Sequence, residues 1–206
     1  MIYNQDCMEA MKEMTDNQFD LAIVDPPYGY GDKKTNILNF RQKEQHREWN
    51  IAPNEKYFKE LFRVSKNQII WGGNYFPFIW AFGGRCFIYW HKGNPVPNFA
   101  DGELAWTSFD KNAKQYDYRY YGNLEGNSSA TKKFHPTQKP ISLYEWLLMN
   151  YAKEGDTILD THLGSGSIAI ACYNLGFDLT GYEIDKEYFE AAKKRIEQHK
   201  QQGRLW

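Results

Sequence analysis

Short apolar runs and helical spacings alternate along the chain. Apolar runs that end at turn or charged residues predict strands at residues 19–24, 68–71, 86–90, 103–106, 157–160 and 179–183. Apolar positions with helical spacing predict helices at residues 7–14, 54–65, 140–151, 167–175 and 187–201. Strands that alternate with helices indicate an α/β fold with a doubly wound, mostly parallel sheet that is covered by helices on both faces.

Two polar segments interrupt this pattern. Residues 29–50 lack apolar periodicity and predict a long loop, whereas residues 107–134 are rich in Lys, Tyr, Gly, Asn and Ser and predict a small insertion rather than core. The 206 residues fit one domain, 1–206, with this insertion inside it, and an apolar content of 42% suffices for a sizeable core. Thr137 or Ser142 is expected to cap the helix that follows.

Charge is balanced over the whole chain but not along it. The formal net charge is −1, yet basic residues gather in and around the two polar segments. A local basic stripe attracts phosphate even on a neutral protein, although an ordinary solvated face has the same composition. The candidate DNA contacts are Lys33, Lys34, Arg41, Lys114, Arg119, Lys132 and Lys133. The 7 Trp, 15 Tyr and 13 Phe are expected mainly in the core, and exposed rings beside a cleft can stack on a base.

Cysteine and histidine usage argues against a metal centre. The 3 cysteines are widely separated and form no Cys-x-x-Cys pair, so neither a disulfide framework nor a zinc site is expected. His46, His91 and His199 lack metal-like spacing with acids and are interpreted as surface or satisfied histidines. We find no signal-peptide pattern and no apolar run long enough to span a bilayer, so a cytoplasmic protein without a membrane partner is expected.

A glycine turn between a predicted strand and a predicted helix is the first candidate binding segment. Gly164 and Gly166 let a ligand approach the backbone, and the helix start presents free N–H groups. Glu183 ends the next strand and can accept hydrogen bonds from both ribose hydroxyls of a nucleoside cofactor. A dinucleotide loop would need a third glycine in place of Ala169, and Asp160 would repel a pyrophosphate. The Asp160 carboxylate suits instead the cationic amino or sulfonium end of S-adenosylmethionine.

The segment Asp25-Pro26-Pro27-Tyr28 follows another predicted strand and is the candidate catalytic segment. A base amino group is a poor nucleophile because its lone pair is delocalised into the ring. Acceptors aimed at its two N–H bonds, here the Asp25 carboxylate and the Pro26 carbonyl, would let the nitrogen become tetrahedral as it reacts. The prolines stiffen the turn, and Tyr28 could stack on a base flipped out of a duplex.

Together these segments resemble the S-adenosylmethionine-dependent DNA amino-methyltransferases. The chain is similar to the permuted group in which Asp-Pro-Pro-Tyr precedes the cofactor glycines, and in particular to small adenine-specific enzymes of phage and prophage type. The resemblance covers nearly the whole chain and lies in residues 4–7, 25–28, 70–76, 135–140, 160–167 and 181–185. It implies a Rossmann-like fold of the methyltransferase type, in which the insertion at 107–134 serves target recognition.

The resemblance also implies roles for single residues. Asp6 and Cys7 would border the cofactor adenine, Glu183 would hold the ribose, and residues 135–139 would close over the methionine end. The full expected cofactor set is Asp6, Cys7, Asp25, His135, Thr137, Lys139, Asp160, His162, Gly164, Ser165, Gly166, Ser167, Glu183 and Ile184. The family usually has Pro-Phe where this chain has Thr161-His162, which puts the packing role of that Phe in doubt.

The implied reaction is direct methyl transfer to N6 of adenine in double-stranded DNA. Asp at the first position of the catalytic segment is the commoner choice for adenine in the family, whereas Ser often accompanies cytosine N4, which stays as the alternative. Cys86 starts a strand and Cys172 lies within a helix, so carbon-5 methylation of cytosine is disfavoured. An RNA or protein-amide methyltransferase and a noncatalytic DNA-binding module are the remaining rivals. The short insertion favours a homodimer on DNA, and a partner endonuclease of a restriction–modification pair is not identified by this sequence.

Overall fold

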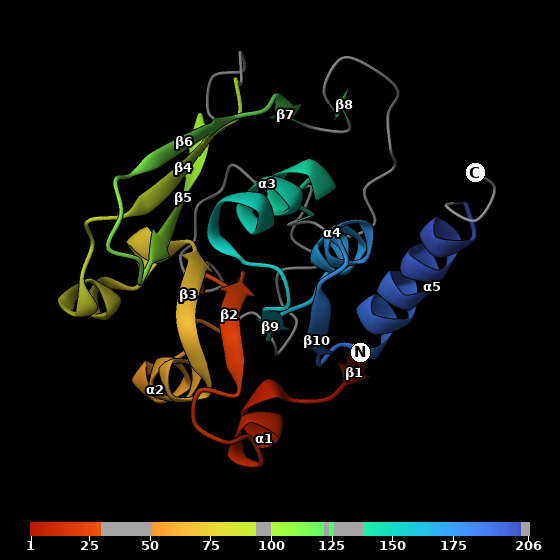
Figure 1. Ribbon diagram of the computed structural model, residues 1–206, viewed down its shortest axis with the longest axis horizontal. Coiled ribbons are helices and arrows are strands. Elements are labelled where there is room, and N and C mark those ends of the chain that lie inside the picture. Colours follow the sequence, from red (N-terminus) through yellow and green to blue (C-terminus); the bar gives the residue numbers. More distant parts are fainter. Residues whose placement is uncertain (30–50, 94–99, 122–123, 126–137, 203–206) are drawn as a thin grey trace, which may run out of the picture.

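The computed structural model describes residues 1–29, 51–93, 100–121, 124–125 and 138–202, and it contains one large sheet (Figure 1). The 8 strands of this sheet follow the order β1-β10-β9-β2-β3-β5-β4-β6. Their bounds are β1 Ile2–Asn4, β2 Phe19–Val24, β3 Ser65–Trp71, β4 Phe87–His91, β5 Gly102–Thr107, β6 Lys114–Asp117, β9 Thr157–Asp160 and β10 Asp178–Glu183. A separate pair of short strands consists of β7 Tyr120–Tyr121 and β8 Leu124–Glu125.

Helices cover both faces of the sheet, as the alternating pattern predicts (Figure 1). On one face lie α1 Cys7–Lys12 and α2 Glu55–Val64, and on the other lie α3 Ile141–Tyr151, α4 Ser167–Leu175 and α5 Lys186–Gln202. Two 3-10 turns, Gly73–Tyr75 and Pro77–Phe82, follow β3.

Strand β2 shows how the sequence creates the two layers. Leu21 and Ile23 pack with α3 and α4, whereas Ala22 and Val24 pack with α1 and α2. Successive side chains of a strand point to opposite faces, so an uninterrupted apolar run is what a strand buried on both faces requires.

The order of the strands creates a crevice between β2 and β9. Strands β1, β10, β9, β2 and β3 are mutually parallel, and β5 is antiparallel to both β3 and β4. From β2 the chain passes through α2 to β3 on one side, and from β9 it passes through α4 to β10 on the other side. Where connections diverge in this way, the carboxyl ends of the two strands border a ligand crevice.

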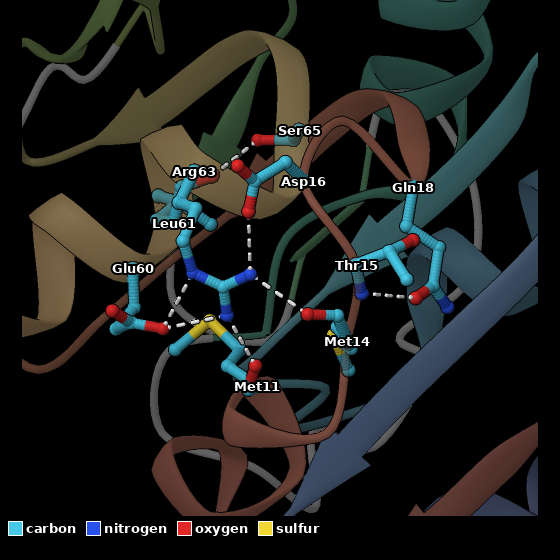
Figure 2. Close-up of polar contacts among 9 residues, drawn as sticks. All are labelled: Met11, Met14, Thr15, Asp16, Gln18, Glu60, Leu61, Arg63 and Ser65. Atoms are coloured by element: carbon cyan, nitrogen blue, oxygen red, sulfur yellow. Dashed lines mark hydrogen bonds and ion pairs between the residues drawn. The ribbon is translucent and has the colours of Figure 1, made fainter.

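Helix α1 is fastened to α2 by Arg63 (Figure 2). The guanidinium donates to the carbonyl oxygens of Met11, at 2.6 Å, and Met14, at 2.7 Å, at the end of α1 and just beyond it. The same group pairs with Asp16 at 2.9 Å and with Glu60 at 2.7 Å. This clamp holds α1 on α2 and so keeps the start of α1 beside the carboxyl end of β1.

Three local predictions differ from the structure. The segment predicted as an insertion from residue 107 begins inside β5, and its β6 joins the main sheet beside β4, with Tyr116 packed against the core. Ser142 does not cap α3, because Pro140 is the N-cap residue without a side-chain hydrogen bond, and the Ser142 hydroxyl instead accepts a hydrogen bond from Tyr116 at 3.1 Å. Strand β1 was not expected, because only one of its 3 residues is even half-buried.

The predicted loop 29–50 and Thr137, the other proposed cap, lie outside the described residues, apart from Gly29. Within the described part of the chain, no helix is long and apolar enough to cross a membrane.

Candidate active site

Asp25 stands directly after β2, at the carboxyl edge of the sheet. Its side chain is only 12% exposed. One carboxylate oxygen, Oδ1, accepts a hydrogen bond from the Tyr28 hydroxyl at 2.7 Å, and the other, Oδ2, pairs with the ammonium group of Lys139. Pro26 is buried and Pro27 half-buried between them. Residues 25–28 therefore fold back on themselves and hold the Asp25 carboxylate in a fixed orientation.

The ring of Tyr28 belongs to an aromatic wall at the same edge. It stacks on Tyr75 with ring centroids 4.8 Å apart and meets the edge of Phe76 at 6.3 Å. Gly72 makes room for this ring, because a Cβ at that position would lie 2.1 Å from a Tyr28 ring carbon. Burial, followed by the charge of Asp25, raises the pKa of Tyr28 well above its usual value, so the hydroxyl keeps its proton.

The glycine turn begins at Asp160, the last residue of β9, which is 2% exposed. Its carboxylate accepts a hydrogen bond from the His162 backbone N–H at 3.0 Å. Burial, which outweighs that hydrogen bond, raises the pKa of Asp160 to about 8. Gly164 and Gly166 have positive φ values of 50° and 71°, which glycine adopts without strain.

Glu183 ends β10 next to this turn. Its Oε2 accepts from the Gly164 N–H and its Oε1 from the Asp185 N–H, both at 2.9 Å. Burial raises the pKa of Glu183, and these backbone N–H groups oppose the shift. Each oxygen keeps a further lone pair, so the oriented carboxylate can still accept hydrogen bonds from a diol.

The residues expected around the cofactor adenine lie at the same edge. Asn4 pairs with Glu183 across β1 and β10, and the Asn4 amide donates to the carbonyl oxygens of Glu183 at 2.8 Å and Ile184 at 3.2 Å. Asp6 caps α1 by accepting from the Met8 N–H at 2.7 Å. Cys7 is half-buried, and burial raises its pKa to about 12, so it stays a thiol.

His162 stands where the family usually has Phe, and it packs as an aromatic ring. Its ring meets the edge of Tyr57 at a centroid distance of 5.3 Å. Thr161 shares hydrogen bonds with the Tyr57 hydroxyl, at 2.6 Å, and with Nδ1 of His162, at 2.9 Å. Burial lowers the pKa of His162 to about 4, so the imidazole is neutral. The Thr161-His162 pair thus keeps the packing of the turn through hydrogen bonds.

Two residues that the sequence analysis did not identify support the site. Arg195 of α5 donates to the Ser165 carbonyl at 2.8 Å and to the Ser167 hydroxyl at 2.9 Å. The Ser167 hydroxyl donates in turn to the Lys139 carbonyl at 2.7 Å, which ties the glycine turn to the start of α3. Glu103 of β5 pairs with Lys139 at 3.2 Å. Neither residue carries a sequence signal, because each lies within an ordinary helix or strand pattern.

Lys139 was expected at the methionine end of a cofactor, and the structure places its ammonium group on Asp25 and Glu103. Of the predicted DNA contacts, Lys114 and Arg119 are exposed, on β6 and just after it. His91 and His199 make polar contacts at the surface, with Asp117 at 2.9 Å and Asn174 at 2.7 Å. The remaining predicted residues lie outside the described part of the chain: Lys33, Lys34, Arg41, His46, Lys132, Lys133, His135 and Thr137.

The donor set of this crevice fits S-adenosylmethionine. In the described ranges no ammonium or guanidinium group pairs with Asp160, although the carboxylate is buried. A cationic ligand group would supply the missing counter-charge. Glu183 offers the diol acceptor beside it, and the backbone at Gly164 can be approached closely. The described residues contain no cluster of metal-ligating side chains.

Comparisons with known proteins point the same way. The family model described as DNA methylase, of the N6 and N4 type, matches residues 19–194. The Type II methyltransferase M.HpaI of Haemophilus parainfluenzae is 27% identical, over 92% of this chain and 72% of its own length. The Type II methyltransferase M2.DpnII of Streptococcus pneumoniae is 25% identical, over 96% and 89%.

Solved structures share the fold. The M1.HpyAVI–SAM complex aligns with a TM-score of 0.64 at 26% identity, covering 95% of this chain and 98% of that one. The cytosine-N4-specific PvuII DNA methyltransferase aligns with a TM-score of 0.62 at 14% identity, covering 96% and 90%. The second likeness shows the fold alone, and it matches the predicted Rossmann-like sheet of the methyltransferase type.

Proposed function

Because the chain belongs to the DNA methylase family of N6 and N4 enzymes, we propose that it methylates N6 of adenine at a specific sequence in double-stranded DNA. The coarser activity follows from the family: the chain is a DNA methyltransferase, and S-adenosylmethionine is its cofactor. When bound, the cofactor supplies an electrophilic methyl group on a sulfonium.

The observation that carries the proposal is the position of Asp25 beside Asp160 at the crevice between β2 and β9. The cofactor-binding half is Asp160, the glycine turn and Glu183. The catalytic half is the segment 25–28. A nucleoside bound on the first half lies next to a base presented to the second half, because both occupy the same sheet edge.

Asp25 acts on the amino group of the target base. Its carboxylate accepts one N–H, and the Pro26 carbonyl accepts the other, which localises the nitrogen lone pair for attack. Tyr28 and Tyr75 form the aromatic surface against which a flipped base stacks. After transfer the surplus proton on nitrogen leaves to solvent or to Asp25.

Transfer is direct, without a covalent enzyme intermediate. Cys86 is buried just before β4, and burial raises the pKa of Cys172 to about 12. Cys7 has its pKa raised to about 12 by burial as well. A thiolate nucleophile, which carbon-5 methylation of cytosine requires, is therefore disfavoured at Cys7 and Cys172.

The choice of adenine rests on Asp at position 25, by resemblance to the family's adenine enzymes. Cytosine N4 is the alternative, and the likeness of fold to the cytosine-N4-specific PvuII enzyme keeps it open. Both amino groups are attached to aromatic rings, so the same acceptors serve either one.

The test is to incubate the protein with labelled S-adenosylmethionine and DNA that lacks methylation, and then to separate the nucleosides. We expect all of the label on N6-methyladenine, and sequencing of the modified DNA then gives the recognition site. Label only on N4-methylcytosine would overturn the adenine assignment. Label on neither nucleoside, together with no heat of S-adenosylmethionine binding, would favour the noncatalytic module.

A further inference from the structure

A chain of alternating charges runs from the catalytic aspartate into the antiparallel part of the sheet. Asp25 contacts Lys139, Lys139 contacts Glu103 at 3.2 Å, and Glu103 contacts Lys92. The residues come from the loop after β2, the segment before α3, the first half of β5 and the residue after β4. All of these positions lie at one edge of the sheet, because β5 runs opposite to β2 and β4.

These side chains are withdrawn from solvent. Lys139 is 3% exposed, Asp25 12%, Lys92 18% and Glu103 26%. The Lys139 ammonium lies 5.2 Å from the centre of the Trp71 ring, and the Lys92 ammonium lies 4.7 Å from the centre of the Trp90 ring. A buried lysine without partners would lose its proton, so the contacts decide its charge.

The contacts keep Lys139 and Glu103 ionised. Burial would lower the pKa of Lys139, but Asp25 and Glu103 reverse this and raise it. Burial would raise the pKa of Glu103, but Lys139 and Lys92 bring it down to about 2. The carboxylate of Asp25 therefore always faces a full positive charge.

Glu103 reduces the effect that the positive charge of Lys139 has on Asp25. As the methyl group arrives, positive charge develops on the amino nitrogen, and Asp25 stabilises it through its own negative charge. A lysine in contact with Asp25 alone would cancel that charge. With Glu103 on its other side, the Lys139 ammonium is shared between two carboxylates, so it offsets less of the negative charge of Asp25.

We propose that Glu103 is a positioning residue for methyl transfer, which acts through Lys139 to keep Asp25 aligned and negative, and that Lys139 has this role rather than a role in holding the cofactor. The inference rests on the proposed function of Asp25. It assigns a part in catalysis to β5, a strand that carries none of the family's motifs identified above.

The first test compares Glu103→Gln, Lys139→Met and the double variant in the full-length protein. We expect kcat to fall about tenfold in Glu103→Gln and about a hundredfold in Lys139→Met, with KM for DNA within about threefold. Because Glu103 acts through Lys139, adding Glu103→Gln to Lys139→Met should lower kcat no further. Additive losses would overturn the proposal, as would a wild-type kcat in Glu103→Gln.

The matched control is Lys66→Met, which removes another lysine–carboxylate pair. Lys66 of β3 pairs with Asp20 of β2 at 2.6 Å, near the amino ends of these strands. The control variant should leave kcat unchanged. Glu103→Gln is nearly isosteric and keeps its oxygen for Lys92, so it remains informative if Lys139→Met does not fold.

The pH profile of kcat separates positioning from packing. Without Lys139, the buried Asp25 takes up a proton more readily, so the acidic limb should move upward by about 1 to 3 pH units. Other groups facing Asp25 are Tyr28, Tyr57 of α2, Tyr144 of α3 and Asp160 of β9, and the variant leaves all of them in place. A lower kcat with an unmoved profile would indicate packing alone and overturn the proposal.

Cofactor affinity distinguishes the two possible roles of Lys139. Calorimetry with S-adenosylmethionine should give affinities within about threefold of wild type for both single variants. A loss beyond tenfold in Lys139→Met would place the lysine on the cofactor instead. If the wild-type protein methylates no DNA, the proposed function itself is wrong. If the wild type is active and the Glu103 and Lys139 variants keep its kcat, only the positioning role of these two residues is wrong.

Discussion

An aspartate lies near each end of strand β2. Both pair with a lysine and accept a hydrogen bond from a hydroxyl, but Asp20 is 28% exposed and Asp25 only 12%. Asp20, near the start, pairs with Lys66 at 2.6 Å and accepts from the N–H and the hydroxyl of Thr157, both at 3.0 Å. It thereby joins β2 to β3 and β9. The hydrogen bond from Lys66 is the largest reason why the pKa of Asp20 is lowered to about 2.

At the other end, Asp25 lies beside Asp160, and neither side chain links β2 to a neighbouring strand as Asp20 does. Asp160 is buried without a paired cation among the described residues, and its pKa is raised to about 8. The two ends of the strands therefore contribute differently to the free energy of unfolding. Asp20 stabilises the sheet at the amino ends of the parallel strands, whereas Asp160, at their carboxyl ends, is buried at a cost in stability.

The largest expected effect is on catalysis. Asp25→Ala removes the acceptor for the amino N–H, so kcat should fall at least about a thousandfold, while affinity for S-adenosylmethionine stays within about tenfold. Methylation of DNA and calorimetry measure the two quantities. Asp20→Ala is the control at the other edge and should retain kcat; equal losses in both variants would break the comparison.

Two glycines with positive φ, one at each end of the parallel strands, allow a second comparison of kcat. Gly72, with φ 69°, follows β3 at the carboxyl edge, where a Cβ would strike the Tyr28 ring, and Gly155, with φ 84°, precedes β9 at the amino edge with open space around it. Gly72→Ala should lower kcat about a hundredfold by displacing Tyr28.

Gly155→Ala introduces similar backbone strain, about 1 kcal/mol, without touching the site. It should lower the melting temperature slightly and leave kcat unchanged. If Gly155→Ala impaired methylation as much as Gly72→Ala, strain rather than the position of Tyr28 would be responsible.

The two edges should also respond to pH with opposite signs. For Asp160 the folded-state pKa, about 8, lies above the unfolded value, so the folded protein binds more protons and stability falls as pH rises from about 4 to about 8. Asp160→Asn should therefore stabilise the protein by up to about 5 kcal/mol at pH 8 and by almost nothing at pH 4. The same variant should weaken cofactor binding.

For Asp20 the folded-state pKa, about 2, lies below the unfolded value, so its contribution is present above about pH 4 and is lost as pH falls toward 2. Asp20→Asn should destabilise by about 1 kcal/mol at pH 7, a value reduced by solvent screening. Thermal unfolding across pH gives both curves, and slopes of the same sign would contradict the comparison.

The smallest effect belongs to Lys66. Its pair with Asp20 is half-exposed on the lysine side, at 54%, so Lys66→Met should lower the free energy of unfolding only slightly, and less still with added salt. Chemical denaturation in low and high salt measures this. A loss as large as that of Asp20→Asn would mean that this pair stabilises the sheet more than surface screening allows.

The sequence predicted the parts of the fold in which one pattern dominates. Residues 157–160 and 167–175 form β9 and α4 as predicted, because an apolar run and a helical spacing are each uninterrupted there. Strand β6 was not predicted, because three of its 4 residues are exposed and its pattern is that of a loop. An edge strand packs on few neighbours, so little in its sequence has to be apolar.

The sequence indicates those candidate site residues whose chemical type the reaction or the cofactor requires. It does not indicate the residues that only support them through contacts across the fold. Asp25, Asp160 and Glu183 stand at strand ends beside glycines or prolines, and the crevice brings their elements together. Glu103 and Arg195 depend on distances across the fold, which no local spacing encodes.

The sheet order has a consequence for how the protein is made. Strands β9 and β10 lie between β1 and β2, although they follow every other described strand in the chain. Until about residue 183 has emerged, β1 has no neighbour to pair with and β2 is open along one side. Such distant pairing is slow to form, and an unpaired central strand is exposed to aggregation in the meantime. A nascent chain therefore carries Asp25 from the time β2 is made, but the crevice beside it is complete only after β9 and β10 have emerged.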